Sequence, residues 1–301
     1  MKNKLKMFFC LTLLSAVGAC GESETSADIE EYGQTLGESM SGVDEMGGSS
    51  GSLASAATVD PRSHQIAAIF KRYAPEEMRN SFLQDLIPEA QAASCSYTFS
   101  CASNTRSRSF DSCQMGRLTF NGSISVAFSG TGASSCLLSG DGASAARSPN
   151  YTATGLRGAT LQVQKTGSVG QKIARVSQGN FTFSNDGIRR TFTAANGSVL
   201  VDFSTETTAD ISVVGSSRSN RTLNGGTLRV TNHLTDVTCD MTPSNLKWAS
   251  SACTCPNSGS WSGSCSDGKV FTLEMGSSCG EASLTLGDET QDISLDSCIG
   301  I

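Results

Sequence analysis

The sequence predicts a mainly β protein, built as an antiparallel meander in the form of a sandwich, a barrel or a curved half-barrel, with a short N-terminal pair of helices. Apolar and polar residues alternate in many short stretches after residue 94, and Asn-Gly or Asp-Gly steps separate several of them. Helical spacing is recognised only between residues 59 and 93. Such alternation is typical of antiparallel strands that bury one face and expose the other.

Residues 59–93 account for the predicted helices. Ile66, Ile69, Phe70 and Tyr73 fall on one face of a helix. After Pro75, which suits the first position of a helix, the spacing is repeated by Met78, Phe82, Leu83 and Leu86. We expect this pair to dock on the body, with capping of a sheet edge or binding of a partner as the alternatives. In a curved half-barrel the pair would be the plug, and the whole would resemble the lipid-carrying half-barrels of bacterial envelopes.

Residues 94–301 are predicted to form one disulfide-stabilised β domain. The apolar sets that alternate with polar residues are Ile124, Val126 and Phe128; Leu161 and Val163; Phe181 and Phe183; Val199, Val201 and Phe203; Ile211 and Val213; Leu228 and Val230; Phe271 and Leu273; Leu284 and Leu286. Turns are expected at Asn121-Gly122, Asn185-Asp186-Gly187, Asn196-Gly197, Asn224-Gly225-Gly226 and Asp267-Gly268. The stretch from Arg147 to Arg229 is basic and the stretch after it is acidic, so we expect charges to pair across neighbouring strands. A basic face for an anionic partner, such as lipopolysaccharide or a wall polymer, is the alternative.

The first twenty residues contain an export signal. Three lysines within residues 1–6 precede an apolar run over residues 7–19. This run is too short to span a bilayer in the mature protein, which requires about 20 residues. The run ends in Val17-Gly18-Ala19-Cys20, which resembles the lipobox of bacterial lipoproteins. The resemblance implies removal of residues 1–19 and attachment of lipid to Cys20, whereas ordinary cleavage after Ala19 would leave Cys20 as a free thiol. In enterobacterial lipoproteins an Asp directly after the lipid site favours the inner membrane, so with Gly21 at that position the resemblance implies the outer membrane.

Residues 20–58 are predicted to be a disordered acidic tether. The segment has many Glu and Asp residues and no Lys or Arg, is rich in Gly and Ser, and has few large apolar side chains. Such a composition cannot bury enough surface to offset the entropy lost on ordering. A flexible chain of this length would have an r.m.s. span of about 35 Å. The body could therefore stand off a membrane and remain attached to it.

The chain contains twelve cysteines, of which Cys10 lies in the signal and Cys20 at the lipid site. The other ten fall into two groups: Cys95, Cys101, Cys113 and Cys136, then Cys239, Cys253, Cys255, Cys265, Cys279 and Cys298. In an oxidising compartment an even number of cysteines indicates disulfides. We expect two bridges in the first group and three in the second, with the pairing left open. Cys253 and Cys255 would lie on one face of a strand, which favours two different partners over each other. A metal site and a redox-active pair are the alternatives.

The sequence carries no convincing catalytic signature. Gly276 to Gly280 matches the nucleophile-elbow pattern at Ser278, but the residues after it read as a strand where the elbow requires a helix. His233 is expected at the surface. Trp261, amid Gly and Ser, either packs on a disulfide or is a binding contact. No metal or other cofactor is predicted, and a net charge of -6 does not suggest nucleic acid as a partner.

Together these observations predict a lipid-anchored protein of the bacterial cell envelope, at the outer membrane, with a structural or binding role. Its partners would be the membrane, through the lipid anchor, and an envelope protein, a lipid or a glycan. An envelope or secreted hydrolase acting on glycans is the alternative, and a surface adhesin or a lipid-binding half-barrel is a second alternative. We expect a binding function more than catalysis.

Overall fold

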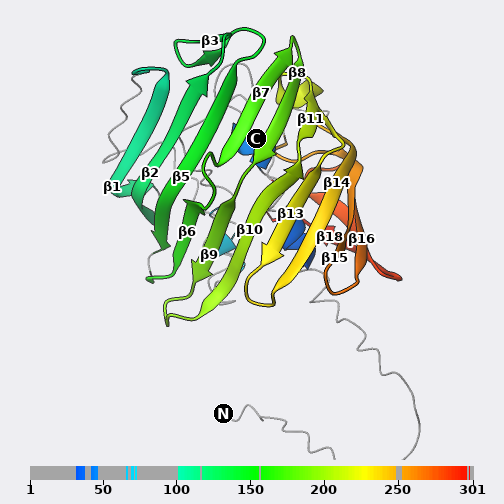
Figure 1. Cartoon of the computed structure of the whole chain (residues 1–301). Coiled ribbons are helices and arrows are strands. Elements are labelled where there is room, and N and C mark those ends of the chain that lie inside the picture. The colour runs from blue at the N-terminus through cyan, green and yellow to red at the C-terminus, as the bar shows by residue number, and fades with distance from the viewer. Residues whose placement is uncertain are drawn as a thin grey trace, which may run out of the picture.

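The computed structural model describes residues 32–37, 42–46, 66, 69, 70, 72, 101–115, 117–155, 157–248, 253–296 and 298. Most of them belong to one antiparallel sheet of 16 strands, and β3 and β4 form a separate ribbon (Figure 1). The elements are α2 (Gly42–Met46), β1 (Thr105–Met115), β2 (Leu118–Ser129), β3 (Ala133–Ser134), β4 (Leu137–Leu138), β5 (Ser144–Gly155), β6 (Thr160–Lys165), β7 (Gln171–Ser177), β8 (Asn180–Asn185), β9 (Ile188–Thr193), β10 (Val199–Ala209), β11 (Ile211–Val214), the 3-10 turn η1 (Arg218–Asn220), β12 (Thr222–Asn224), β13 (Thr227–Asn232), β14 (Val237–Lys247), β15 (Ser258–Cys265), β16 (Val270–Met275), β17 (Glu281–Leu286) and β18 (Glu289–Ser294). The prediction of a mainly β, antiparallel protein is confirmed.

The sheet divides into two arms that meet again, so its hydrogen bonds form a ring. One edge of β5 pairs with β7 through residues 144–147 and with β6 through residues 150–154. The first arm continues through β8, β11 and β12, and the second through β9, β10, β13 and β14. The ring closes where β12 pairs with the end of β14, Leu223 lying opposite Leu246. Strands β2 and β1 extend the sheet beyond β5, and β15 to β18 extend it beyond β14. The structure is therefore not a regular barrel.

The core lies on the inner face of this sheet, where the predicted alternation places the apolar side chains. Ile124, Phe181, Ile211 and Leu284 are buried, as are all the other alternating residues named above except Val199 and Val201. Val199 is 42% exposed. The alternation thus predicted which side chains of each strand face the core nearly throughout the domain.

Helical residues from the N-terminal part of the chain cover the inner face. Residues 32–37 and 66, 69, 70 and 72 are helical in addition to α2, and Figure 1 draws these blue segments behind the sheet. The Phe70 ring packs edge-on against Phe192 of β9, with the ring centres 5.1 Å apart. Ile66 and Ile69 are buried beside it. Docking is confirmed for these four described residues of the predicted segment, but α2 is the only α-helix whose bounds are described, in place of the predicted pair. The second predicted helix, around Met78 and Leu86, lies outside the described residues.

The prediction of a disordered tether is wrong for residues 32–37 and 42–46. Leu36, Val43 and Met46 are at most 2% exposed. Glycine supports this docking because it lets the backbone approach the sheet closely: a side-chain carbon added at Gly33 would lie 2.3 Å from the Ile293 methyl group of β18. The glycine content that suggests disorder therefore also allows helical residues to pack closely against a strand. The rest of the predicted tether lies outside the described residues.

Four of the five predicted turns connect strands as expected, at Asn185-Asp186-Gly187, Asn196-Gly197, Asn224-Gly225-Gly226 and Asp267-Gly268. The prediction of a turn at Asn121-Gly122 is wrong, because both residues lie within β2. Gly122 has φ +113, and an added side-chain carbon would lie 2.3 Å from the Asn150 carbonyl oxygen. The Asn121 side chain accepts a hydrogen bond of 2.8 Å from the Ser112 amide at an irregularity in β1. Glycine is therefore required here by the positive φ and the close approach of β5, within an irregular pair of strands.

Candidate functional site

A pocket of about 290 Å³ lies where two hairpin turns meet the N-terminal helical residues. Its walls come from residues 32–37, from the β13–β14 hairpin and from the β15–β16 turn. The lining side chains are Tyr32, Thr35, Leu36, Val230, Asn232, Thr235, Val237, Cys239, Asp267 and Lys269. Hydroxyl, amide and charged groups therefore share the pocket with an apolar wall, which is the composition of a site for a small molecule.

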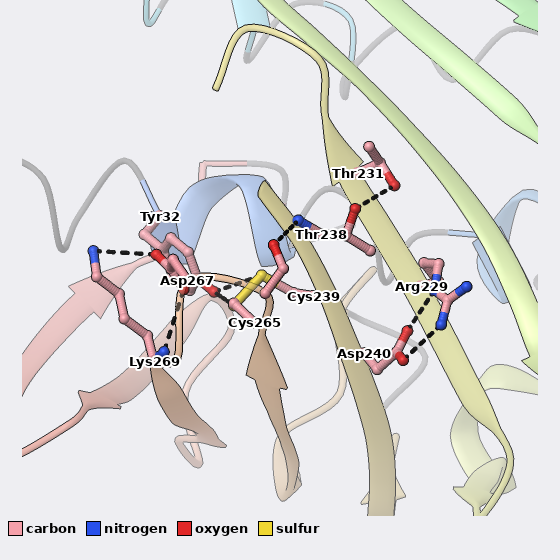
Figure 2. The surroundings of a disulfide bond; sticks show 10 residues. Tyr32, Arg229, Thr231, Thr238, Cys239, Asp240, Cys265, Asp267 and Lys269 are labelled. Carbon is pink, nitrogen blue, oxygen red and sulfur yellow. Dashed lines mark hydrogen bonds and ion pairs between the residues drawn. A yellow bond between two sulfur atoms is a disulfide. The ribbon is translucent and has the colours of Figure 1, made fainter. Parts of the chain in front are cut away.

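Strand register creates one wall of the pocket. Val230 lies opposite Cys239, and Cys239 lies opposite Cys265 on the next strand. The two cysteines are disulfide-bonded, with their α-carbons 3.9 Å apart. Figure 2 shows this bridge beside Tyr32, Asp267 and Lys269. The covalent link joins the two hairpins that form the pocket, so it holds that wall in place.

Tyr32 closes the pocket from the helical side. Its hydroxyl group contacts the sulfur of Cys239 at 2.8 Å and also the sulfur of Cys265, and its ring packs edge-on against Phe271. Burial, together with the nearby carboxylate of Asp267, raises the pKa of the Tyr32 hydroxyl above its ordinary value. The hydroxyl group therefore stays protonated at physiological pH and remains a hydrogen-bond donor.

The two charged groups of the pocket belong to one turn. The Asp267 carboxylate accepts a hydrogen bond of 3.2 Å from the Lys269 amide, and its other oxygen lies 3.7 Å from the Lys269 ammonium group. Because one acid and one base neutralise each other, the pocket carries no net charge from its lining. This arrangement suits a small neutral or zwitterionic ligand with hydroxyl groups more than it suits a simple anion or cation.

A buried ionic cluster holds α2 against the point where the two arms of the sheet diverge. The Glu45 carboxylate lies 2.6 Å from the Arg190 guanidinium and 3.4 Å from that of Arg147. It also accepts a hydrogen bond from Gln171, whose oxygen accepts one of 2.8 Å from Arg147. Burial alone would raise the pKa of Glu45, but Arg190 and Arg147 lower it to about 2. The carboxylate is ionised and fully engaged, which makes it a structural group and unsuitable as a general base.

The cysteine predictions are largely confirmed. The bridges Cys101–Cys136, Cys239–Cys265, Cys253–Cys279 and Cys255–Cys298 each stay within one of the two predicted groups. Cys253 and Cys255 pair with two different partners, as their spacing predicted. Cys113 is disulfide-bonded as well. Cys95 and the lipidation candidate Cys20 lie outside the described residues.

Trp261 is a core residue. Its side chain is 1% exposed, on the inner face of β15, so the interpretation of Trp261 as a surface binding contact is wrong. The Gly and Ser residues around it belong to the same strand, in which Ser262 and Ser264 are exposed. Trp248 is buried too, and its indole N–H donates a hydrogen bond of 3.1 Å to the Thr254 carbonyl oxygen.

His233 is exposed, as predicted. Its Nε2 lies 3.0 Å from the Ser204 hydroxyl oxygen. A histidine next to a serine hydroxyl is the arrangement found in serine hydrolases. The nearby Asp202 carboxylate, however, accepts two hydrogen bonds from Arg189, of 2.7 and 2.6 Å. With that carboxylate engaged elsewhere, nothing in this arrangement orients the imidazole as a catalytic base. Ser278 lies in the turn between β16 and β17, with no helix after it among the described residues.

Sequence reasoning missed Tyr32 and Glu45, the two residues that connect the N-terminal segment to the body. A signal for them was present. Tyr32 is followed by Leu36, and Val43 by Met46, which are helical spacings of four and three residues. Each pair is too short to stand out from an acidic, Gly-rich background, so composition outweighed periodicity.

Among the residues that the structure describes, no group of three or more His, Cys, Asp or Glu side chains is arranged to hold a metal ion. Within that described part of the chain, no helix has the length and apolar character needed to span a bilayer. The chain matches no protein-family model, no curated protein and no solved structure.

Proposed function

We propose that this chain is a lipid-anchored protein of the bacterial cell envelope, at the outer membrane, that binds a small hydroxyl-bearing ligand. Two lines of argument support the location. The disulfides are those of an extracytoplasmic protein, since such bonds persist in oxidising compartments. The lipobox-like Val17-Gly18-Ala19-Cys20 supplies the attachment point, and several acyl chains on one cysteine would make attachment effectively permanent.

The pocket beside Cys239–Cys265 is the observation that carries the binding role. Its hydroxyl and amide groups, on Tyr32, Thr35, Asn232 and Thr235, face a space of about 290 Å³ with an apolar wall. That size suits a single sugar residue or a ligand of similar size. The neutral balance of Asp267 and Lys269 favours a ligand without strong net charge.

Membrane attachment is tested by the Cys20→Ser variant of the full-length chain. The wild-type protein should incorporate radiolabelled palmitate and fractionate with the outer membrane, and the variant should do neither. The matched control is Ala19→Ser, which keeps a small residue directly before Cys20. This variant should still incorporate palmitate. If the Cys20→Ser protein kept the label and the membrane fraction, the lipid anchor would be ruled out.

Binding is tested by photocrosslinking in intact cells with p-benzoylphenylalanine placed at Asn232, which lines the pocket. The same group at Gln178, exposed in the turn between β7 and β8, is the control. We expect a mass adduct of defined composition at position 232 and none at 178. Identical adducts at both positions, or none at either, would argue against a ligand in this pocket.

A further inference from the structure

Four turns lie together at one end of the sheet, and we call them the lower rim: residues 194–198, 233–236, 266–269 and 287–288. Strand register places them there. The His233 amide donates to the Asp202 carbonyl oxygen, the Ser266 amide to that of Thr238, and the Gly287 amide to that of Val270. Each hairpin end is thus hydrogen-bonded to the next strand or turn, and Figure 1 shows the β9–β10 and β13–β14 turns along the lower edge of the sheet.

The lower rim carries exposed apolar side chains. Leu234, in the β13–β14 turn, is 50% exposed. Directly after two other rim turns, Val270 at the start of β16 is 61% exposed, and Val199 and Leu200 at the start of β10 are 42% and 36% exposed. These four are half of the large apolar side chains that the described residues leave exposed. The other four are Leu137, Val169, Val176 and Val214, and Val176 and Val214 lie near the paired ends of β7, β8 and β11. Exposed apolar side chains mark surfaces that can contact something apolar, and the position of the N-terminal residues distinguishes the lower rim from the other end.

The described part of the chain begins at the same end. Tyr32 shares the pocket with Thr235 and Lys269, which belong to the lower-rim turns. Tyr32 is twelve positions beyond Cys20, and twelve residues span at most about 40 Å when extended and about 20 Å as a flexible chain. A body of this size is about 45 Å across. Docking of residues 32–37 therefore shortens the tether to less than the width of the body, and a lipid at Cys20 would lie near the lower rim.

We infer that the lower rim faces the bilayer and that Leu234 and Val270 insert into its interfacial layer. This inference rests on the proposed lipid anchor at Cys20. Because Lys269 is accompanied by Asp236, Asp267 and Asp288 in the same turns, the contact is apolar and does not depend on anionic lipid. The anchor provides the membrane affinity, and the rim determines how the body is oriented on the membrane.

Tryptophan scanning with brominated lipid tests this orientation. The full-length lipidated protein is reconstituted into phosphatidylcholine vesicles with and without lipid brominated in its acyl chains. The variants are Leu234→Trp and Val270→Trp at the rim, and Val176→Trp, 59% exposed, near the end of β7 in the other arm of the sheet. The native Trp248 and Trp261 are buried and provide the background that the wild-type protein measures.

We expect brominated lipid to quench the added fluorescence of both rim variants at least about twofold more than that of Val176→Trp, since interfacial groups lie roughly 5–10 Å into the membrane. Adding anionic lipid should not change the result. Flotation of the vesicles separates the two proposals. If the protein floats with the vesicles but the rim variants are quenched no more than Val176→Trp, the orientation is wrong and the anchor stands. If the wild-type protein does not float, both fail.

Discussion

Glu45 and Arg190 are separated by 145 positions in the sequence, yet they form an ion pair of 2.6 Å in which each side chain is 8% exposed. Arg147 approaches the same carboxylate from β5. This cluster joins a short helix near the N-terminus to both arms of the sheet. It turns a segment whose composition predicts disorder into part of the fold, and it makes that segment a target for experiments.

Replacing Glu45 with Gln should destabilise the protein strongly. The change leaves two buried guanidinium groups without a carboxylate, and breaking a buried ion pair in this way costs about 3–5 kcal/mol. The matched control is Glu206→Gln, because the Glu206 carboxylate lies 3.9 Å from Arg229 with both side chains more than a third exposed. That variant should change the free energy of unfolding by less than about 0.5 kcal/mol. Urea denaturation measures both, and equal losses would contradict the structural role of Glu45.

Acid should remove the contribution of Glu45. Its pKa is about 2 in the folded protein against an ordinary 4.5, so the unfolded chain takes up the proton first as the pH falls. The stabilisation is complete above about pH 4.5 and is lost as the pH falls toward 2, a change of about 3 kcal/mol. The difference in unfolding free energy between wild type and Glu45→Gln should therefore shrink as the pH falls from about 4.5 to about 2.5. Parallel pH profiles for the two proteins would show that the carboxylate is not responsible.

Gln34 should protect the edge of β18. Its side chain is 2% exposed, donates to the Ser294 carbonyl oxygen at 2.5 Å and accepts from the Asp296 amide at 2.9 Å, as a neighbouring strand would. Gln34→Leu leaves both backbone groups without these partners and should cost about 2–4 kcal/mol. Gln162→Leu, at an exposed site on β6, is the control. Hydrogen exchange of the Asp296 amide should accelerate in the first variant only, and unchanged exchange there would refute the contact.

Proteolysis without reduction, followed by mass spectrometry, should recover four defined linkages. They are Cys101 with Cys136, Cys239 with Cys265, Cys253 with Cys279, and Cys255 with Cys298. Each closes a loop of 26 to 43 residues and should stabilise the fold by about 2–4 kcal/mol. A peptide in which Cys253 is linked to Cys255, or free thiol at any of the eight, would contradict this connectivity.

Local sequence patterns predicted the strands well because a strand reports its buried face through every second residue. Ile124, Val126 and Phe128 are buried as their alternation indicates. The pairing of charges across strands was also predictable in kind, and Arg229 lies opposite Asp240 with hydrogen bonds of 2.8 and 2.9 Å. The prediction of a turn at Asn121-Gly122 and the alternative of Trp261 as a binding contact are both wrong for one reason. Gly, Ser and Asn occur both in turns and in strands where another backbone comes close.

The sequence by itself predicts an export signal and lipid attachment at Cys20, and it determined the strand periodicity and the division of the cysteines into two groups. These depend on residues that are close together in the chain. Only the tertiary structure decided that the sheet splits and closes into a ring, that Tyr32 meets the Cys239–Cys265 bridge, and that Glu45 is buried between Arg147 and Arg190. Tyr32 and Glu45 are 102 to 233 positions away from these side-chain partners. No local pattern specifies which distant groups will neutralise a buried charge or fill a pocket wall.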